Sequence, residues 1–174
     1  MALWRVRATV DDRPGYLSVL TASLALRSIN ILSVQVHATE GGALDEFLVD
    51  APDPLGEDDL VEAVRKGRGR DPWVCRADAR GLVDDPTRVL GIAAVVAADP
   101  TRLEHGLTAL LGDCEVSRGR GEVAGNSATV MVLTDPAGGT IVVRRVAPAF
   151  TPAEFARAHA LVEVARAGAY HTSL

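Results

Sequence analysis

The sequence contains few aromatic residues and only two cysteines. The first shortage limits what the core can be made of, and the second argues against disulfide and metal sites. Aromatic side chains make up 4% of the 174 residues while 48% of the chain is hydrophobic, so we expect a core of Ala, Val and Leu. The two cysteines, Cys75 and Cys114, lack the spacing of a metal site and a secretory context. We therefore expect reduced thiols and no disulfide framework.

Excess positive charge and long apolar runs are also missing. The chain has 18 basic and 23 acidic residues and a net charge of −5, whereas a protein that binds the phosphate backbone needs a basic face. The opening stretch MALWRVRATVDD contains no apolar signal core, and no apolar run reaches the length of a bilayer. We expect a cytoplasmic protein with neither a nucleic-acid nor a membrane partner.

Motifs that carry catalysis are missing as well. The chain has no G-x-S-x-G nucleophile turn, no clustered His/Cys/Asp metal set and no nucleotide-binding fingerprint. The glycine-rich stretch RGRGEVAGN (118–126) contains Glu122 and lacks the strand and helix of a phosphate cradle, so it predicts a flexible loop. The sequence predicts no enzyme, no cofactor and no metal.

The first 78 residues alternate between two periodicities. Every-second-residue patterns predict strands at 3–10, 29–37 and 43–51, and a short closing strand at 71–78. A leucine stripe predicts a helix over 16–27, and a second helix lies within 53–69, with acids in its first turn and basic residues in its last. A Gly-Gly turn at 41–42 joins the second and third strands.

This order predicts an α+β fold: a ferredoxin-like βαββαβ domain over residues 1–80, with two helices on one face of a four-stranded antiparallel sheet. Such a sheet leaves a face or its edges open, so we expect a homodimer. Trp4, Val6, Val34 and Val36 are candidates either for the paired surface or for the core.

The stretch DDRPGYLSVL (11–20) joins the first strand to the first helix. In one interpretation Gly15 only turns the chain and Pro14 fixes the start of the helix. In the other, the missing side chain lets a ligand reach the backbone, and the free amides near Tyr16 and Leu17 receive a carboxylate. The residues alone leave both interpretations open.

Residues 10–37, VDDRPGYLSVLTASLALRSINILSVQVH, resemble the opening of an ACT domain, the small regulatory module of amino-acid metabolism. The acid and the Pro-Gly pair after the first strand, the leucine-striped helix and the INI at the second strand carry the resemblance. With the later elements it extends over residues 1 to about 80. It implies a non-catalytic regulatory protein that binds an amino acid or a similar small carboxylate.

The resemblance also implies where that ligand binds: between the first loop and the start of the second strand, commonly supplied by a paired subunit. Asp12 would accept from the ligand's ammonium group, and Asn30 would offer its amide, although asparagine also suits an αL position between helix and strand. The implied ligand-binding residues are Asp11, Asp12, Pro14, Gly15, Tyr16, Leu17, Asn30 and Ile31. The alternative is a dimerisation or interaction module that keeps the fold without a ligand.

Residues 84–174 predict a second, smaller α+β domain, after a boundary near 78–86. Asp-Pro pairs at Asp85 and Asp99 each begin a helical stretch; the first, 89–98, is a helix or a buried strand, and its alanines favour a helix. Residues 128–146 predict a hairpin. A capping box of Thr151 and Glu154, with Phe150 packing on Phe155, predicts a final helix.

The end of the chain weakly resembles the end of a GAF domain, over about 40 residues. A degenerate second ACT module is the rival, although no helix separates its last two strands. A third class is an enzyme that acts through this second domain.

Overall fold

The computed structural model describes residues 2–77, 85–119 and 125–172. The chain divides into two compact units, Met1–Val83 and Asp84–Leu174, and each has its own hydrophobic core. Most of the predicted domain boundary near 78–86 lies outside the described residues, which omit 78–84, and residues 85 and 86 belong to the first helix of the second unit. The middle of the glycine-rich loop, 120–124, also lies outside the described residues.

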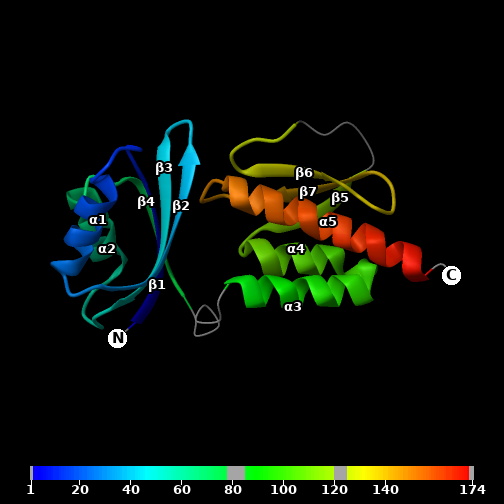
Figure 1. The fold of residues 1–174 in the computed structure, drawn as a ribbon, viewed down its shortest axis with the longest axis horizontal. Helices are drawn as coiled ribbons and strands as arrows, with labels where there is room; N and C mark the ends of the chain where they lie inside the picture. Colours follow the sequence, from blue (N-terminus) through cyan, green and yellow to red (C-terminus); the bar gives the residue numbers. More distant parts are fainter. Residues whose placement is uncertain (1, 78–84, 120–124, 173–174) are drawn as a thin grey trace. The chain divides into compact units, whose positions relative to one another are not determined.

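The N-terminal unit has the predicted ferredoxin-like fold. Its elements are β1 (Ala2–Val10), α1 (Tyr16–Ala25), β2 (Asn30–Thr39), β3 (Gly42–Ala51), α2 (Glu57–Lys66) and β4 (Arg70–Arg76). The strands lie in the order β2-β3-β1-β4, and all neighbours are antiparallel. Figure 1 shows α1 and α2 together on one face of this sheet. The α+β class and the βαββαβ order are confirmed.

The central strand β1 forms the floor of the core. Trp4, Val6, Ala8 and Val10 alternate along it and are all buried. They belong to the same cluster as Leu20 and Leu24 of α1, Phe47 of β3 and Leu60 of α2. Trp4 and Val6 are therefore core residues.

The edge strand β2 is much less covered. Leu32, Val34 and Val36 are 42%, 43% and 52% exposed. Val34 pairs with Phe47 and Val36 with Asp45, so both valines lie on the face that carries the helices, beyond the part that the helices bury. Of the four candidate residues, Val34 and Val36 are exposed.

The C-terminal unit is also α+β. Its elements are α3 (Asp85–Ala98), a 3₁₀ turn η2 (Pro100–Arg102), α4 (Leu103–Leu111), β5 (Glu115–Gly119), β6 (Val130–Thr134), β7 (Thr140–Arg144) and α5 (Pro152–Thr172). The strands form an antiparallel sheet in the order β5-β7-β6. Helices α4 and α5 contact this sheet, and α3 packs on both of them. This order of elements differs from βαββαβ.

Local signals in the C-terminal unit are confirmed at two helix starts. The Asp99 carboxylate accepts from the Thr101 amide at 3.1 Å, ahead of Pro100-led η2 and then α4. Thr151 and Glu154 exchange backbone-to-side-chain bonds of 2.7 and 3.1 Å, as a capping box requires. The rings of Phe150 and Phe155 meet edge to face, with centroids 5.9 Å apart.

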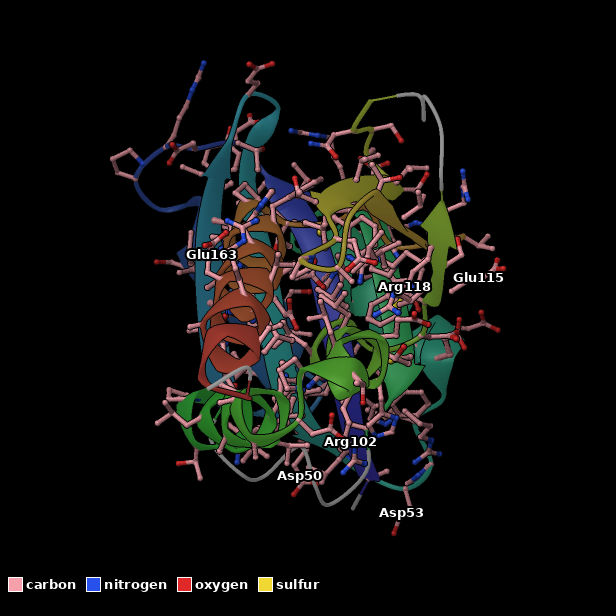
Figure 2. The ribbon with its side chains drawn as sticks, turned by 90° about the vertical axis from the view of Figure 1, so that its right-hand side faces the viewer. Asp50, Asp53, Arg102, Glu115, Arg118 and Glu163 are labelled. Atoms are coloured by element: carbon pink, nitrogen blue, oxygen red, sulfur yellow. The ribbon has the colours of Figure 1, made fainter. Side chains whose placement is uncertain are left out.

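One strand of this unit was not predicted. Residues 115–119 form β5, so Arg118 and Gly119 are strand residues and their assignment to a loop is wrong. Figure 2 labels Glu115 and Arg118 on this strand. The segment has a single strongly apolar residue, Val116, so its composition does not predict a strand. Its pairing with β7 is what makes it one.

Candidate functional site

The loop after β1 forms a tight turn that ends in a left-handed glycine. The Arg13 amide donates to the Asp11 carbonyl at 2.8 Å, and the Tyr16 amide donates to the Arg13 carbonyl at 3.3 Å. Gly15 precedes α1 with φ of 93°, a conformation that side chains with a Cβ rarely adopt. A Cβ placed there would meet no atom within 4 Å. The left-handed backbone conformation therefore explains the glycine at this position, whereas steric crowding does not.

After the Tyr16 amide, which donates to the Arg13 carbonyl, the next amides of α1 have no side-chain cap among the described residues. Gly15 provides no side-chain cap, and no acidic residue lies in the first turn. The first amides of a helix have no partner inside it and carry the positive end of the helix dipole. Pro14 and Gly15 in front of them are exposed, and Tyr16 and Leu17 are half-buried. The helix start is therefore an accessible place for an anion.

The two acids of the loop have different roles. Asp11 accepts from the Arg70 guanidinium, whose other nitrogen donates to the Gly41 carbonyl at 3.0 Å. Hydrogen bonds from Arg70, and to a smaller extent from Tyr16, lower the pKa of Asp11 below its usual value. Asp11 thus ties the loop to β4. Asp12 is exposed and forms no ion pair with any residue that the structure describes.

Arg13 and Arg70 were not among the predicted site residues. Arg13 is exposed beside Asp12, so the loop presents one acid and one base next to each other. Arg70 comes from a strand 59 residues away, and only the sheet pairing brings it to Asp11. The first could have been found from its place in DDRPG, whereas no local signal points to the second.

Asn30 and Ile31 lie at the opposite end of the sheet. Asn30 pairs with Asp50, which in turn pairs with Leu3 at the start of β1, whereas the loop leaves from Val10. Seven residues of strand, at roughly 3.3 Å each, separate the two ends by about 23 Å. One small ligand cannot touch both groups in a single chain. The left-handed position before β2 belongs to Ser28, with φ of 58°, so Asn30 is not there to supply it.

Asp45 was not among the predicted site residues. It lies between Ala8 and Val36 on the helix-covered face of β3, two residues from the Ala43 that pairs with Val10. Its side chain is fully buried, and neither carboxylate oxygen has a hydrogen-bond partner among the described residues. Burial raises the pKa of Asp45 to about 6. The sequence does contain a signal for this burial: Asp45 and Phe47 are two residues apart on one strand, so their side chains point to the same face of the sheet.

The described residues contain neither a candidate metal cluster nor a candidate membrane-spanning helix. Within that part of the chain, no group of three or more His, Cys, Asp or Glu side chains is placed to hold a metal ion. None of its helices combines the length and the apolar character that crossing a membrane requires.

The chain matches no protein-family model and no curated protein. Distant likenesses exist among solved structures: an unknown protein from Galdieria sulphuraria (15% identity, 93% of this chain and 89% of that chain, TM-score 0.41) and the ligand-free regulatory subunit of aspartate kinase from Thermus thermophilus (13%, 94% and 93%, 0.36). A formyltetrahydrofolate deformylase from Pseudomonas putida KT2440 matches over 43% of this chain, at 14% identity and a TM-score of 0.37. This chain covers only 29% of that deformylase. These values are too low to carry a function from those proteins to this chain.

Proposed function

We propose that the N-terminal unit is a non-catalytic regulatory module of ACT type, and that it binds an amino acid or a similar small carboxylate at the loop between β1 and α1. The observation that carries this proposal is the uncapped start of α1 behind an exposed left-handed Gly15. A carboxylate there would accept hydrogen bonds from the amides that begin at Leu17, since the Tyr16 amide already donates to the Arg13 carbonyl.

The charges of the loop complement a zwitterion. Asp12 is exposed and without an ion pair among the described residues, so it accepts from the ligand's ammonium group. Arg13, also exposed, adds positive charge on the carboxylate side. Asp11 takes no ligand because Arg70 already occupies it.

Pairing of two chains would complete the site. β2 is a sheet edge with exposed Leu32, Val34 and Val36, and an uncovered edge of this kind favours pairing with a second strand. A two-fold axis beside β2 runs the two edges antiparallel, so the start of one lies beside the end of the other. The sheet end that carries the loop then meets Asn30 of the partner subunit. This pairing removes the separation of about 23 Å along the strands, and three strand spacings, roughly 14 Å, remain across the sheet between β1 and the partner's β2.

Calorimetry with the common amino acids on purified protein tests the proposal. We expect one class of amino acid to bind, and Gly15→Ala to abolish or greatly weaken that binding, because a Cβ strains the αL position that aims the amides. Gly138→Ala is the matched control: its φ of 98° imposes similar strain, a Cβ there also meets no atom within 4 Å, and it lies in the other unit. Heat absent with every amino acid, or equal affinity in both variants, would refute the proposal.

A dimerisation module without a ligand is the second candidate. The exposed apolar residues of β2 favour it, together with Val19 on α1 and Leu26 directly after α1, which are 40% and 88% exposed. A stable dimer whose melting temperature no amino acid raises would support this candidate, because a ligand that binds only the folded state must raise it.

A further inference from the structure

A groove of about 320 Å³ runs between α3 and α4 in the C-terminal unit. Every residue that lines it belongs to α3, η2 or α4: Arg88, Gly91, Ile92, Val95, Arg102, His105, Gly106 and Ala109. It is therefore a property of this unit alone. Its volume is at the small end of the range of ligand pockets.

The middle of the groove is apolar and open to solvent. Ile92, Val95 and Ala109 provide its apolar walls, and Val95 is 42% exposed. Single exposed apolar residues are common on protein surfaces, but Val95 and Ala109 are both exposed and line the same groove. A ligand with an apolar surface would bind favourably here, because covering these side chains removes apolar surface from water.

Two glycines line the groove for different reasons. At Gly106 a Cβ would lie 2.7 Å from a methyl of Val96 and 3.3 Å from one of Leu161, so close helix packing accounts for this glycine. At Gly91, in the interior of α3, a Cβ would meet no atom within 4 Å. Alanine would stabilise the helix there, and nothing in the unit prevents it. The open notch at Gly91 is thus unexplained by the packing of the chain itself.

The rim of the groove is basic. Arg88, Arg102 and His105 line it, and no acid does so among the described residues. Arg88 donates to the Ala109 carbonyl at 2.8 Å. Arg102, labelled in Figure 2, is exposed and forms no ion pair with any residue in the part of the chain that is described.

The acids beside this rim in the sequence have other partners: Glu104, next to His105, pairs with Arg118 at 2.9 Å, and Asp99 is bonded to Thr101. Asp99 accepts two hydrogen bonds from Thr101, of 3.1 and 2.6 Å, and these lower its pKa more than the charge of Arg102 does. Three basic residues around one apolar hollow stand out in a chain whose net charge is −5.

We propose that this groove binds a small organic anion with an apolar body, of the monocarboxylate class. The apolar body covers Val95 and the notch at Gly91, and the carboxylate meets Arg102, with His105 beside it. A purely polar anion would leave the apolar walls uncovered, and a neutral apolar molecule would leave the basic rim unused. The site is separate from the loop of the N-terminal unit and does not depend on it.

Methyl and imidazole NMR signals of the full chain, titrated with phenylacetate, test the proposal. We expect shifts at Ile92, Val95 and His105, and binding about tenfold weaker for the neutral phenylacetamide, since the charged contact is lost. Acetate, which lacks the apolar body, should shift these signals only weakly. The N-terminal loop is monitored in the same spectra through Leu17, so binding there is distinguished from binding in the groove.

Three variants separate effects on binding from effects on stability. Arg102→Gln should weaken phenylacetate about tenfold through the loss of one charged partner, whereas Arg65→Gln, the same change on the exposed last turn of α2, should leave it unchanged. Gly91→Ala should raise the melting temperature and yet weaken binding, because it fills the notch.

Several outcomes would overturn the proposal. These are equal binding of phenylacetate and its amide, equal effects of the two arginine variants, and unchanged affinity in Gly91→Ala. Signals of the groove that change with protein concentration alone would show that a second copy of the chain covers it, and would overturn the proposal as well.

Discussion

Arg145, just after β7, and Glu154, in the first turn of α5, are joined by two parallel hydrogen bonds of 2.9 and 2.8 Å. The side chain of Arg145 is 4% exposed, and it also donates to the Leu111 carbonyl at the end of α4. Its guanidinium lies 4.0 Å from the ring centroid of Phe150. Glu154 accepts in addition from the Thr151 amide. One ion pair therefore connects the sheet with the end of one helix and the start of another.

Replacing Arg145 should strongly destabilise the C-terminal unit. Arg145→Ala leaves the Glu154 carboxylate buried without its charged partner, and we expect a loss of about 3–5 kcal/mol in the free energy of unfolding. Urea denaturation measures it. Arg144→Ala, the exposed neighbour, should change stability by no more than about 0.5 kcal/mol. Equal losses in the two variants would show that the ion pair between Arg145 and Glu154 does not stabilise the unit beyond what an exposed arginine does.

Asp45 should make the N-terminal unit less stable as the pH rises. Its pKa is about 6 in the folded chain against a usual 3.8, so the folded state holds this proton more tightly than the unfolded state. The associated stability is complete below about pH 4 and is lost as the pH rises through 6. The loss approaches about 3 kcal/mol, at about 1.4 kcal/mol per pKa unit.

Asp45→Asn should abolish this dependence and recover part of the stability at pH 7.5, with little gain at pH 4. Thermal unfolding at several pH values measures the effect. Asp50→Asn, on the same strand but incompletely buried, is the control and should keep the wild-type profile. A melting temperature of wild type that does not fall between pH 4 and 7 would contradict the role given to Asp45.

The chain should form a dimer through β2. Light scattering should return about two chains of 18.3 kDa at micromolar concentration. Val36→Lys places a charge on the exposed edge strand and should shift the equilibrium to monomer. Leu90→Lys, at a residue 70% exposed on α3, should leave the dimer intact. A wild-type monomer would show that there is no such contact. Dissociation by Leu90→Lys, but not by Val36→Lys, would show that the dimer contact lies outside β2.

Asp12 should contribute to amino-acid affinity and hardly to stability. Asp12→Ala removes the proposed ammonium acceptor, and we expect affinity to fall by about 1–3 kcal/mol, as for a lost charged hydrogen bond. Calorimetry measures the affinity, and an unchanged melting temperature shows that the fold is intact. Glu40→Ala, also exposed but in the turn between β2 and β3, should bind as wild type does. If both variants bind equally well, Asp12 has no part in recognition.

Much of the fold could be predicted because the local signals agree with each other. The alternation of Trp4, Val6, Ala8 and Val10 predicts a half-buried strand, and all four side chains are buried on the face of β1 that the helices cover. The capping box of Thr151 and Glu154 is encoded within four residues. Such features need no knowledge of distant parts of the chain.

The rest depends on tertiary pairing. β5 lacks a strand pattern of its own and is ordered by β7. The bond between Arg70 and Asp11 spans 59 residues. The distance from Asn30 to the loop follows only from the sheet register, and the implied site residues accordingly form two groups in one chain.

The order β2-β3-β1-β4 also governs how this unit is assembled during translation. β1 is made first, yet its two neighbours are β3, which begins at Gly42, and β4, which ends at Arg76. At roughly 5–20 residues per second, a strand with four apolar core positions waits seconds for partners. Arg5 and Arg7 alternate with those positions, and charged side chains beside an unpaired apolar strand oppose its association with other chains. The alternation that places Arg7 on the face opposite the helices, where it pairs with Glu46 at 2.9 Å in the finished sheet, thus also opposes association of the nascent chain before the sheet exists.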